Sequence, residues 1–374
     1  MDAHGDLDRD ERPPPAPARP RPVAVLAVLV AAALLLVVTL PDRDGGDGAP
    51  GKASAGPSPG DAAAGVEELA SAPGAHVWQL AVGRDGSRAV VWNSGDAYAL
   101  AIDTAEGRGL RELVSRPDVL QAVPGGYLLG NPEGMEGLRV VTPAGVSTPV
   151  VITGGSMEPE PGDLVFYLQD GLVLYRPRDL TVYAPPRLPR GRLSAGWVTP
   201  DGVLVATAYD RRSREVTRAV RRDGRWELTR LTGPGTLTGE VVGYGDRVAI
   251  AVVSSSSPRR PVEVVQTTAD GGRTWHDVSA AARSVRTLGS ATMADDGTLL
   301  LTSADGTRVV RISAAGDAQR LTGAPPVFLR ANAGDRIWAV DAETQSARMY
   351  ASSDLGQTWQ RARLPGRPPC GRQR

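Results

Sequence analysis

Cysteine occurs only once in this sequence, as Cys370, so the chain cannot form an internal disulfide. Histidine is nearly as scarce. His4, His76 and His276 lie far apart, which argues against a histidine-rich metal site and a Ser–His–Asp triad. No glycine-rich phosphate loop opens a helix after a strand, so no nucleotide or other cofactor is expected. The one lysine is Lys52, and 42 basic residues balance 42 acidic ones, so overall charge does not point to nucleic acid. This arginine bias indicates a GC-rich genome, such as that of an actinobacterium.

One long apolar run is present, at residues 23–40, and it is broken only by Thr39. As a helix it would span roughly 27 Å at about 1.5 Å per residue, near the lower limit for crossing a bilayer. A buried soluble helix is disfavoured by its all-round apolarity and polar flanks. A cleaved signal peptide is the stronger alternative, but the nearest small-x-small site, at residues 53–55, lies far downstream. We therefore predict an uncleaved transmembrane helix that anchors the chain in the cell membrane.

Composition around this run predicts the remaining segments. Residues 1–22 read as a disordered, proline-rich cytoplasmic tail, and residues 366–374 as a disordered C-terminal tail. Residues 41–75 read as a Gly/Pro/Ser/Asp linker, with a short helix at 61–70 that Asp61 would cap. The positive-inside rule places the N-terminus in the cytoplasm and the large domain outside. It rests on Arg9, Arg12, Arg19 and Arg21 before the run, against Arg43 and Lys52 after it.

Residues 76–365 consist of short apolar runs separated by turns, with almost no helical periodicity, which indicates an all-β fold. Two classes of turn alternate, and each recurs about every forty residues, seven times. This period predicts a β-propeller of seven four-stranded blades, with six or eight blades as alternatives. The ring would close by packing, or with help from residues 60–75. The first class, expected between first and second strands, is 85–86, 125–126, 162–163, 201–202, 245–246, 296–297 and 334–335; the second, expected between third and fourth strands, is 106–107, 144–145, 178–179, 223–224, 270–271, 315–316 and 354–355.

Two turns of the second class share the pattern hydroxyl-x-Asp-x-Gly-x-Thr-Trp, at residues 268–275 and 352–359. Asp-x-Gly favours a tight turn, because glycine accepts positive φ and the carboxylate bonds nearby N–H groups. The pattern resembles the Asp-box, or BNR repeat, of sialidase-like β-propellers. That resemblance implies a structural role, at an outer turn far from any site, for Thr268, Asp270, Gly272, Thr274, Trp275, Ser352, Asp354, Gly356, Thr358 and Trp359.

Arginines cluster in the segments expected on one face of the propeller, in the loops around the fourth and fifth blades. Guanidinium groups bind carboxylate or phosphate through paired hydrogen bonds, so such a cluster is a candidate anion site. An anionic envelope glycan, a lipid headgroup or an envelope protein would be its partner. Its members are Arg187, Arg190, Arg192, Arg211, Arg212, Arg214, Arg259 and Arg260, and across the same face we expect Glu133, Glu136, Glu158, Glu160 and Asp163.

Catalysis finds little support in the sequence. The sialidase resemblance implies an Arg-Ile-Pro motif, which is missing, since the pairs 311–312 and 336–337 continue with other residues. Tyr209, Asp210 and Glu215 are the nearest candidates, but they fall in one hairpin and would not surround a sugar ring. We therefore assign no catalytic or metal-binding residue and predict a membrane-anchored, extracytoplasmic binding or scaffolding module. A sialidase-like exo-glycosidase and an assembly factor for a membrane complex stay open as alternatives.

Overall fold

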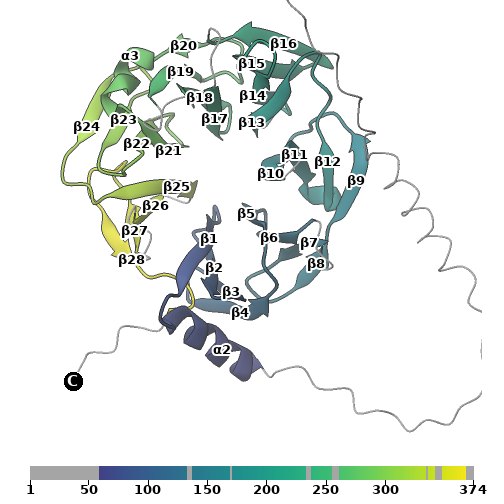
Figure 1. The fold of residues 1–374 in the computed structure, drawn as a ribbon, viewed down its shortest axis with the longest axis vertical. Helices are drawn as coiled ribbons and strands as arrows, with labels where there is room; N and C mark the ends of the chain where they lie inside the picture. The colour runs from purple at the N-terminus through teal and green to yellow at the C-terminus, as the bar shows by residue number, and fades with distance from the viewer. Residues whose placement is uncertain are drawn as a thin grey trace, which may run out of the picture. The chain divides into compact units, whose positions relative to one another are not determined.

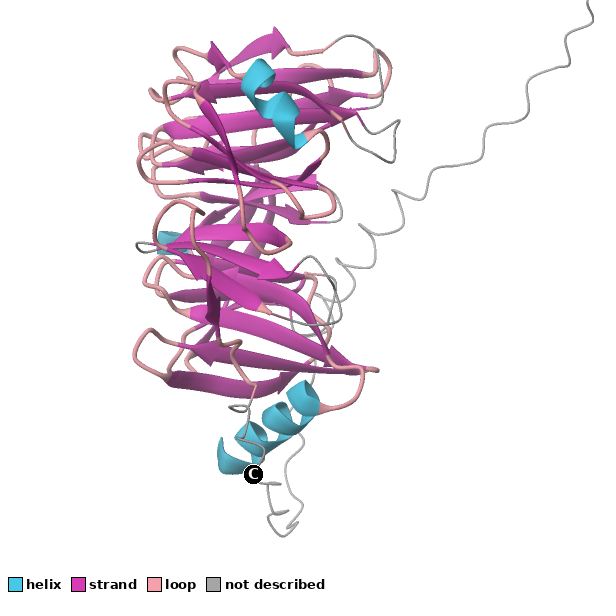
Figure 2. Cartoon of the chain, turned by 90° about the vertical axis from the view of Figure 1, so that its left-hand side faces the viewer, coloured by secondary structure: helices cyan, strands magenta, loops and turns pink. Residues whose placement is uncertain are grey.

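The computed structural model describes residues 59–132, 137–168, 171–232, 237–254, 261–333, 336–341 and 348–367. These residues form seven four-stranded sheets that stand side by side around a common axis (Figure 1). Viewed from its edge the ring is almost entirely strand, with helix only at its margin (Figure 2). The chain therefore contains an all-β, seven-bladed propeller. The predicted fold class is confirmed, and the six- and eight-bladed alternatives are excluded.

The strands follow in chain order. The first blade contains β1 (His76–Val82), β2 (Arg88–Ser94), β3 (Ala97–Asp103) and β4 (Arg108–Val114), and the second β5 (Val119–Val123), β6 (Gly126–Asn131), β7 (Gly137–Val141) and β8 (Ser147–Pro149). The third contains β9 (Val151–Ser156), β10 (Leu164–Leu168), β11 (Gly171–Arg176) and β12 (Thr181–Ala184), and the fourth β13 (Arg192–Val198), β14 (Leu204–Asp210), β15 (Glu215–Arg222) and β16 (Arg225–Arg230). The fifth contains β17 (Leu237–Tyr244), β18 (Arg247–Ser254), β19 (Val262–Thr268) and β20 (His276–Asp277), and the sixth β21 (Leu288–Met293), β22 (Leu299–Ser303), β23 (Val309–Ile312) and β24 (Ala318–Leu321). The seventh contains β25 (Val327–Ala333), β26 (Arg336–Asp341), β27 (Met349–Ser352) and β28 (Gln360–Ala362); the helical segments are α2 (Pro59–Ser71), η1 (Pro177–Asp179), α3 (Ser279–Ala282) and η2 (Arg283–Val285).

The two faces of the ring carry different connections between strands. In six blades the spatial order of the strands, from the axis outward, is also their order in the sequence. Antiparallel pairing then places the first–second and third–fourth connections on one face, which we call the turn face. The opposite face, which we call the loop face, holds the second–third loops and the connections between blades.

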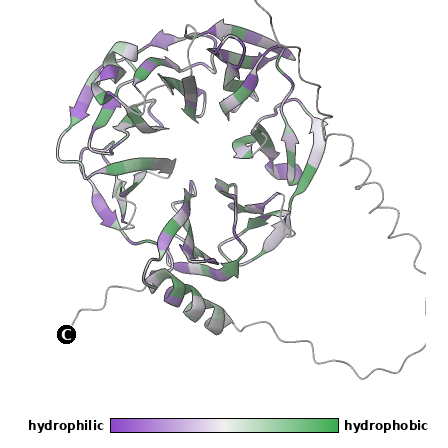
Figure 3. Ribbon diagram, in the orientation of Figure 1, coloured by the Kyte–Doolittle hydropathy of each residue, from purple (hydrophilic) through white to green (hydrophobic). Residues whose placement is uncertain are grey.

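Neighbouring blades share their apolar side chains. Along β2, Val90 and Trp92 pack with Trp338 of the seventh blade, whereas Val91 packs with Tyr127 of the second. Strands buried on both sides read as continuous apolar runs rather than as alternating ones. Hydrophobic colour accordingly runs along strands all around the ring (Figure 3).

The third blade departs from this order. Although β9 precedes β10 in the sequence, it lies at the outer edge and pairs in parallel with β12 (Figure 1). The inner strand β10 also runs antiparallel to β13, the inner strand of the next blade. Pro161, just before β10, lies beside Gly202 at the far end of β13, whereas Gly171, just after β10, lies beside Arg192 at the start of β13. The apolar run of β10 suits the inner position, while exposed β9 contains two glycines. The prediction that turn 162–163 is a first–second hairpin is therefore wrong for this blade, whereas turn 178–179 does join the third and fourth strands in chain order, β11 and β12.

A buried ionic network holds the segment between β9 and β10. Asp163, Arg176 and Tyr183 are each at most 3% exposed. Arg176 donates to both Asp163 oxygens, from Nε at 3.1 Å and from Nη2 at 3.0 Å, and Tyr183 donates to the same carboxylate. Arg176 also pairs with Glu160 at 2.8 Å, and Glu158 accepts from Arg221 Nε of the fourth blade at 3.0 Å. The network ties the irregular blade to its neighbour.

The ring closes by packing between its first and seventh blades, since each of these sheets consists of four consecutive strands and no strand is shared. Trp92 lies in one apolar cluster with Trp338, Met349 and Val66 of α2. The Trp92 indole N–H donates to the carbonyl of Pro365 at 2.8 Å, which fixes the C-terminal segment on the first blade. The chain therefore brings both ends of its described part to the closing seam.

The two ends of the described part, at α2 and at Gly366, differ from the sequence predictions. Gly366, predicted to be tail, packs so closely that an added Cβ would lie 2.8 Å from Ala101, and its φ of +81° suits glycine. The predicted helix at 61–70 is α2, but it begins at Pro59, whose fixed φ suits a first helical position, so Asp61 is not its cap. No helix among the described residues is long and apolar enough to cross a membrane. The predicted span 23–40 lies outside the described part, as do residues 1–22, 41–58 and 368–374.

The two Asp-x-Gly turns of the fifth and seventh blades have the same hydrogen bonds. Thr268 Oγ1 donates to Asp270 Oδ1 at 2.7 Å and accepts from Gly272 N–H at 3.0 Å. Thr274 donates to the Asp270 carboxylate from its N–H at 2.9 Å and from its hydroxyl at 2.6 Å. The corresponding bonds of Ser352, Asp354, Gly356 and Thr358 measure 2.7, 2.8, 2.8 and 2.6 Å.

Each of these turns ends on a tryptophan that packs on the preceding blade. Trp275 joins the cluster of Val205 and Val220 in the fourth blade, and Trp359 joins that of Leu300 in the sixth. Both turns lie on the turn face, so they fasten blades together and leave the loop face to other residues.

We expect Asp163→Ala to lower the free energy of unfolding by about 3–5 kcal/mol, because it leaves the Arg176 guanidinium buried without its main counter-charge. Asp179→Ala is the matched control, since Asp179 meets Arg178 at 3.3 Å on an exposed surface and its loss should cost less than about 0.5 kcal/mol. Urea denaturation measures both. Equal, small effects would show that the network does not hold the third blade.

We expect Asp270→Ala to cost about 1–2 kcal/mol at pH 7 through the lost turn hydrogen bonds. Desolvation alone would raise the pKa of Asp270, but hydrogen bonds from Thr274 outweigh it and hold that pKa well below its usual range. Because the pKa of Asp270 is lower in the folded state than in the unfolded state, its carboxylate stabilises the fold fully above the unfolded pKa of about 3.9. This stabilisation is lost as the pH falls towards the folded pKa.

The difference in unfolding free energy between wild type and Asp270→Ala should therefore shrink between pH 7 and pH 3, measured by urea denaturation. The exposed turn residue Asp96, changed to Ala, is the control and should have no effect at either pH. A difference for Asp270→Ala that does not change with pH would contradict the role of its carboxylate.

Candidate functional site

Six of the eight predicted anion-binding arginines lie at the loop-face end of the fourth blade. Two are in the connection that leads into β13, one is the first residue of β13, and three are in the turn between β14 and β15. The register pairs Arg192 with Tyr209, so both segments lie at the same end of the sheet. We call this group the arginine sector; its members, all exposed, are Arg187, Arg190, Arg192, Arg211, Arg212 and Arg214. Arg259 and Arg260 lie outside the described residues.

The arginine sector has an excess of positive charge. Among the described residues, no carboxylate forms an ion pair with any of its members, whereas Arg176 and Arg221 nearby are both paired. Two carboxylates in the same hairpin are already engaged. Asp210 accepts from the N–H of Arg212 at 2.9 Å, which lowers its pKa, and Glu215 pairs with Arg230 at 2.8 Å. The exposed guanidinium groups are thus available to an anion from solution.

Three of the five acidic residues expected across the loop face lie elsewhere. Glu158 binds Arg221, while Glu160 and Asp163 bind Arg176 in the third blade. Their segment contacts Gly202 on the turn face, so the expectation is wrong for these three. Its physical reason is the unpredicted path of the chain into the third blade. Glu133 and Glu136 lie outside the described residues.

Tyr209, Asp210 and Glu215, the residues considered for glycoside hydrolysis, lie in one β14–β15 hairpin in which Asp210 and Glu215 face each other in the register. With Asp210 bound to its own turn and Glu215 bound to Arg230, neither carboxylate is placed across a cavity from the other. Within the part of the chain that the structure describes, no three His, Cys, Asp or Glu residues are close enough to hold a metal ion. The arrangement favours binding by charge.

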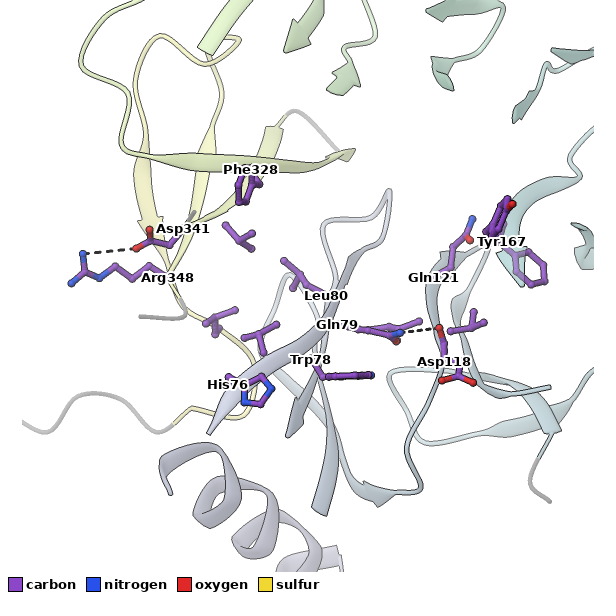
Figure 4. Close-up of a pocket in the computed structure, with 16 residues that line it drawn as sticks. His76, Trp78, Gln79, Leu80, Asp118, Gln121, Tyr167, Phe328, Asp341 and Arg348 are labelled. Atoms are coloured by element: carbon purple, nitrogen blue, oxygen red, sulfur yellow. Dashed lines mark hydrogen bonds and ion pairs between the residues drawn. The ribbon is translucent and has the colours of Figure 1, made fainter. Parts of the chain in front are cut away.

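A pocket of about 500 Å³ lies on the same face, between strands of the first, second, third and seventh blades. Its walls come from the first residues of β1 and β5, the end of β10, and the end of β26 with the residue before β27. Figure 4 shows Trp78 and Gln79 projecting from β1 toward Asp118, with Gln121 and Tyr167 beyond and Phe328 on the opposite side of β1. This volume falls within the range of small-molecule sites.

Trp78 reaches this pocket because β1 contains a β-bulge. Val77 pairs with Trp92 and Gln79 with Val91, so Trp78 is the extra residue and its side chain is redirected. It remains 36% exposed, and the Arg116 guanidinium lies over its ring at 5.0 Å. This pocket was not predicted from the sequence, because the bulge at Trp78 leaves no pattern in the composition of β1.

Comparisons with known proteins agree on the fold alone. No protein-family model matches the chain, and no curated protein sequence matches it significantly. The β-propeller domain of the Trilobed protease from Pyrococcus furiosus, described as having an open velcro topology, is similar in structure, with a TM-score of 0.50 and 10% identity over 77% of this chain and 95% of that one. Virginiamycin B lyase from Staphylococcus aureus gives a TM-score of 0.38 and 11% identity over 77% and 84%. The fold and the site thus define a seven-bladed β-propeller with a charged loop face.

Proposed function

We propose that this chain is a membrane-anchored, extracytoplasmic binding or scaffolding propeller that holds an anionic ligand of the cell envelope at its arginine sector. The observation that carries the proposal is the convergence of six exposed arginines, with no carboxylate paired to them among the described residues, on one end of one blade. Arginine presents a planar set of N–H donors that matches phosphate and carboxylate.

Phosphate and carboxylate groups occur in the envelope in three forms: anionic glycans, lipid headgroups and acidic protein surfaces. The sector lies on two loops, so its side chains can adapt to a polymer or a membrane surface rather than enclosing one small ion. Its exposure makes long-range attraction dependent on salt, with a screening length of about 8 Å at physiological ionic strength.

The anchor and the family remain part of the proposal. The apolar run at 23–40, with more arginines before it than after it, supports a single membrane span with the propeller outside the cytoplasm. The shared hydrogen bonds of the turns at Asp270 and Asp354 support kinship with Asp-box propellers. Because the same turn serves many propellers, that kinship by itself indicates no ligand.

Replacing Arg211, Arg212 and Arg214 together by Ala should weaken binding to phosphatidylglycerol vesicles about 100-fold, since each arginine near an anionic surface contributes about 1 kcal/mol. Residues 56–374, a compact unit by themselves, are suited to this assay because they lack the apolar run. Vesicle co-sedimentation measures the lipid arm, and calorimetry with a phosphate-rich soluble glycan polymer measures the other.

The matched control replaces Arg308, Arg311 and Arg320 of the sixth blade by Ala, which removes the same charge from outside the sector. If both triple variants lose affinity equally, net charge rather than the arginine sector determines binding. If neither polyanion binds the wild-type unit, the proposed anionic ligand is wrong.

A further inference from the structure

The two amide side chains in the pocket beside β1 each donate to a backbone carbonyl. Gln79 donates from Nε2 to the carbonyl of Asp118 at 2.9 Å, and Gln121 donates from Nε2 to the carbonyl of Val165 at 3.0 Å. Because a carbonyl can only accept, these contacts fix which end of each amide is the oxygen. Gln79 Oε1 is shielded from the pocket and accepts from no described residue, so the amide oxygen that a ligand can use is that of Gln121.

Two further side chains of β1 at the pocket also donate to backbone carbonyls. Trp78 donates from Nε1 to the carbonyl of Pro117 at 3.0 Å, and His76 meets the carbonyl of Gly74 through Nδ1 at 3.3 Å. A neutral imidazole that donates from Nδ1 carries its acceptor on Nε2. The exposed carboxylate of Asp118 is a further acceptor, while Arg348 and the Tyr167 hydroxyl are donors in the same lining. The pocket thus presents both acceptors and donors, and a ligand that complements it must both donate and accept hydrogen bonds.

The charges and the aromatic surface of the pocket narrow the choice of ligand. The pocket's Asp341 faces Arg348 at 4.0 Å, so this carboxylate already has a cationic partner within the lining. The Arg116 guanidinium lies over the Trp78 ring at 5.0 Å, so this aromatic face is also occupied by a cation. An ammonium or guanidinium ligand would have to compete with both groups. Tyr167 is 54% exposed, and with Phe328 it offers apolar ring surface.

We propose that this pocket binds a neutral sugar unit. Sugar hydroxyls both donate and accept hydrogen bonds without charge, and the C–H face of a sugar ring is an apolar surface that can lie on the Tyr167 ring. The pocket volume of about 500 Å³ accommodates a ligand of this size. This site is separate from the arginine sector, so it goes beyond the anionic ligand proposed above and does not depend on it.

The test is calorimetric titration of the full chain, in a buffer free of glycoside detergents, with maltose, cellobiose and N,N′-diacetylchitobiose. At least one should bind, with a dissociation constant in the millimolar range or below. Gln121→Leu removes an acceptor and Tyr167→Ala an aromatic surface, so each should weaken that binding by about tenfold or more, equivalent to about 1.4 kcal/mol. Because Tyr167 is exposed, its loss leaves the packing between blades intact.

Gln319→Leu, on the outer strand β24, is the matched control and should bind the sugar as the wild type does. The triple Ala variant of Arg211, Arg212 and Arg214 should also bind it normally, which separates this inference from the arginine sector. The inference is overturned if no sugar binds, if Gln319→Leu weakens binding as much as Gln121→Leu, or if tetramethylammonium binds and the sugars do not.

Discussion

Each blade of this protein has apolar side chains on both of its faces, so no blade is stable until a neighbour covers each one. Six of the seven contacts between blades join sheets that are consecutive in the sequence. The seventh joins the first blade to the last, and no strand is shared across it: it is made by packing around Trp92, Trp338 and Met349, with the C-terminal segment bound through the Pro365 carbonyl. The rest of the ring depends on this seam, because an open ring would expose two apolar faces to water.

The pocket depends on the same seam. Strand β1 belongs to the first blade and lies against the seventh, so the position of its bulged Trp78 is set by the packing that closes the ring. Leu364, in the segment that follows the last strand, also lines the pocket. The arginine sector lies on loops of the fourth blade, away from the seam. The loop face therefore contains two different sites: a pocket beside the seam between the first and seventh blades, and the charged arginine sector on the loops of the fourth blade.

Much of this architecture was predictable, because the turn signals that separate short strands recur at a nearly constant spacing. The strand order of the third blade was not, since the turns at 162–163 and 178–179 look like those of any other blade. There, the two glycines of β9 beside the continuous apolar run of β10 are the signal that could have revealed the exchange. The position of the arginine sector on the loop face was predictable, because the order of strands in a propeller decides on which face each loop lies. The pocket required the bulge at Trp78, a feature of pairing that no single-residue property encodes.

Hydrogen exchange of the intact chain tests closure by packing most directly, because it reports the free energy of local opening strand by strand. If packing alone closes the ring, amides of β1 and β25, on either side of the seam, exchange through a lower-energy opening than amides of β17 and β18 in the fifth blade. Equal protection of all four strands would contradict it, since it would mean that the seam opens no more readily than any other contact between blades.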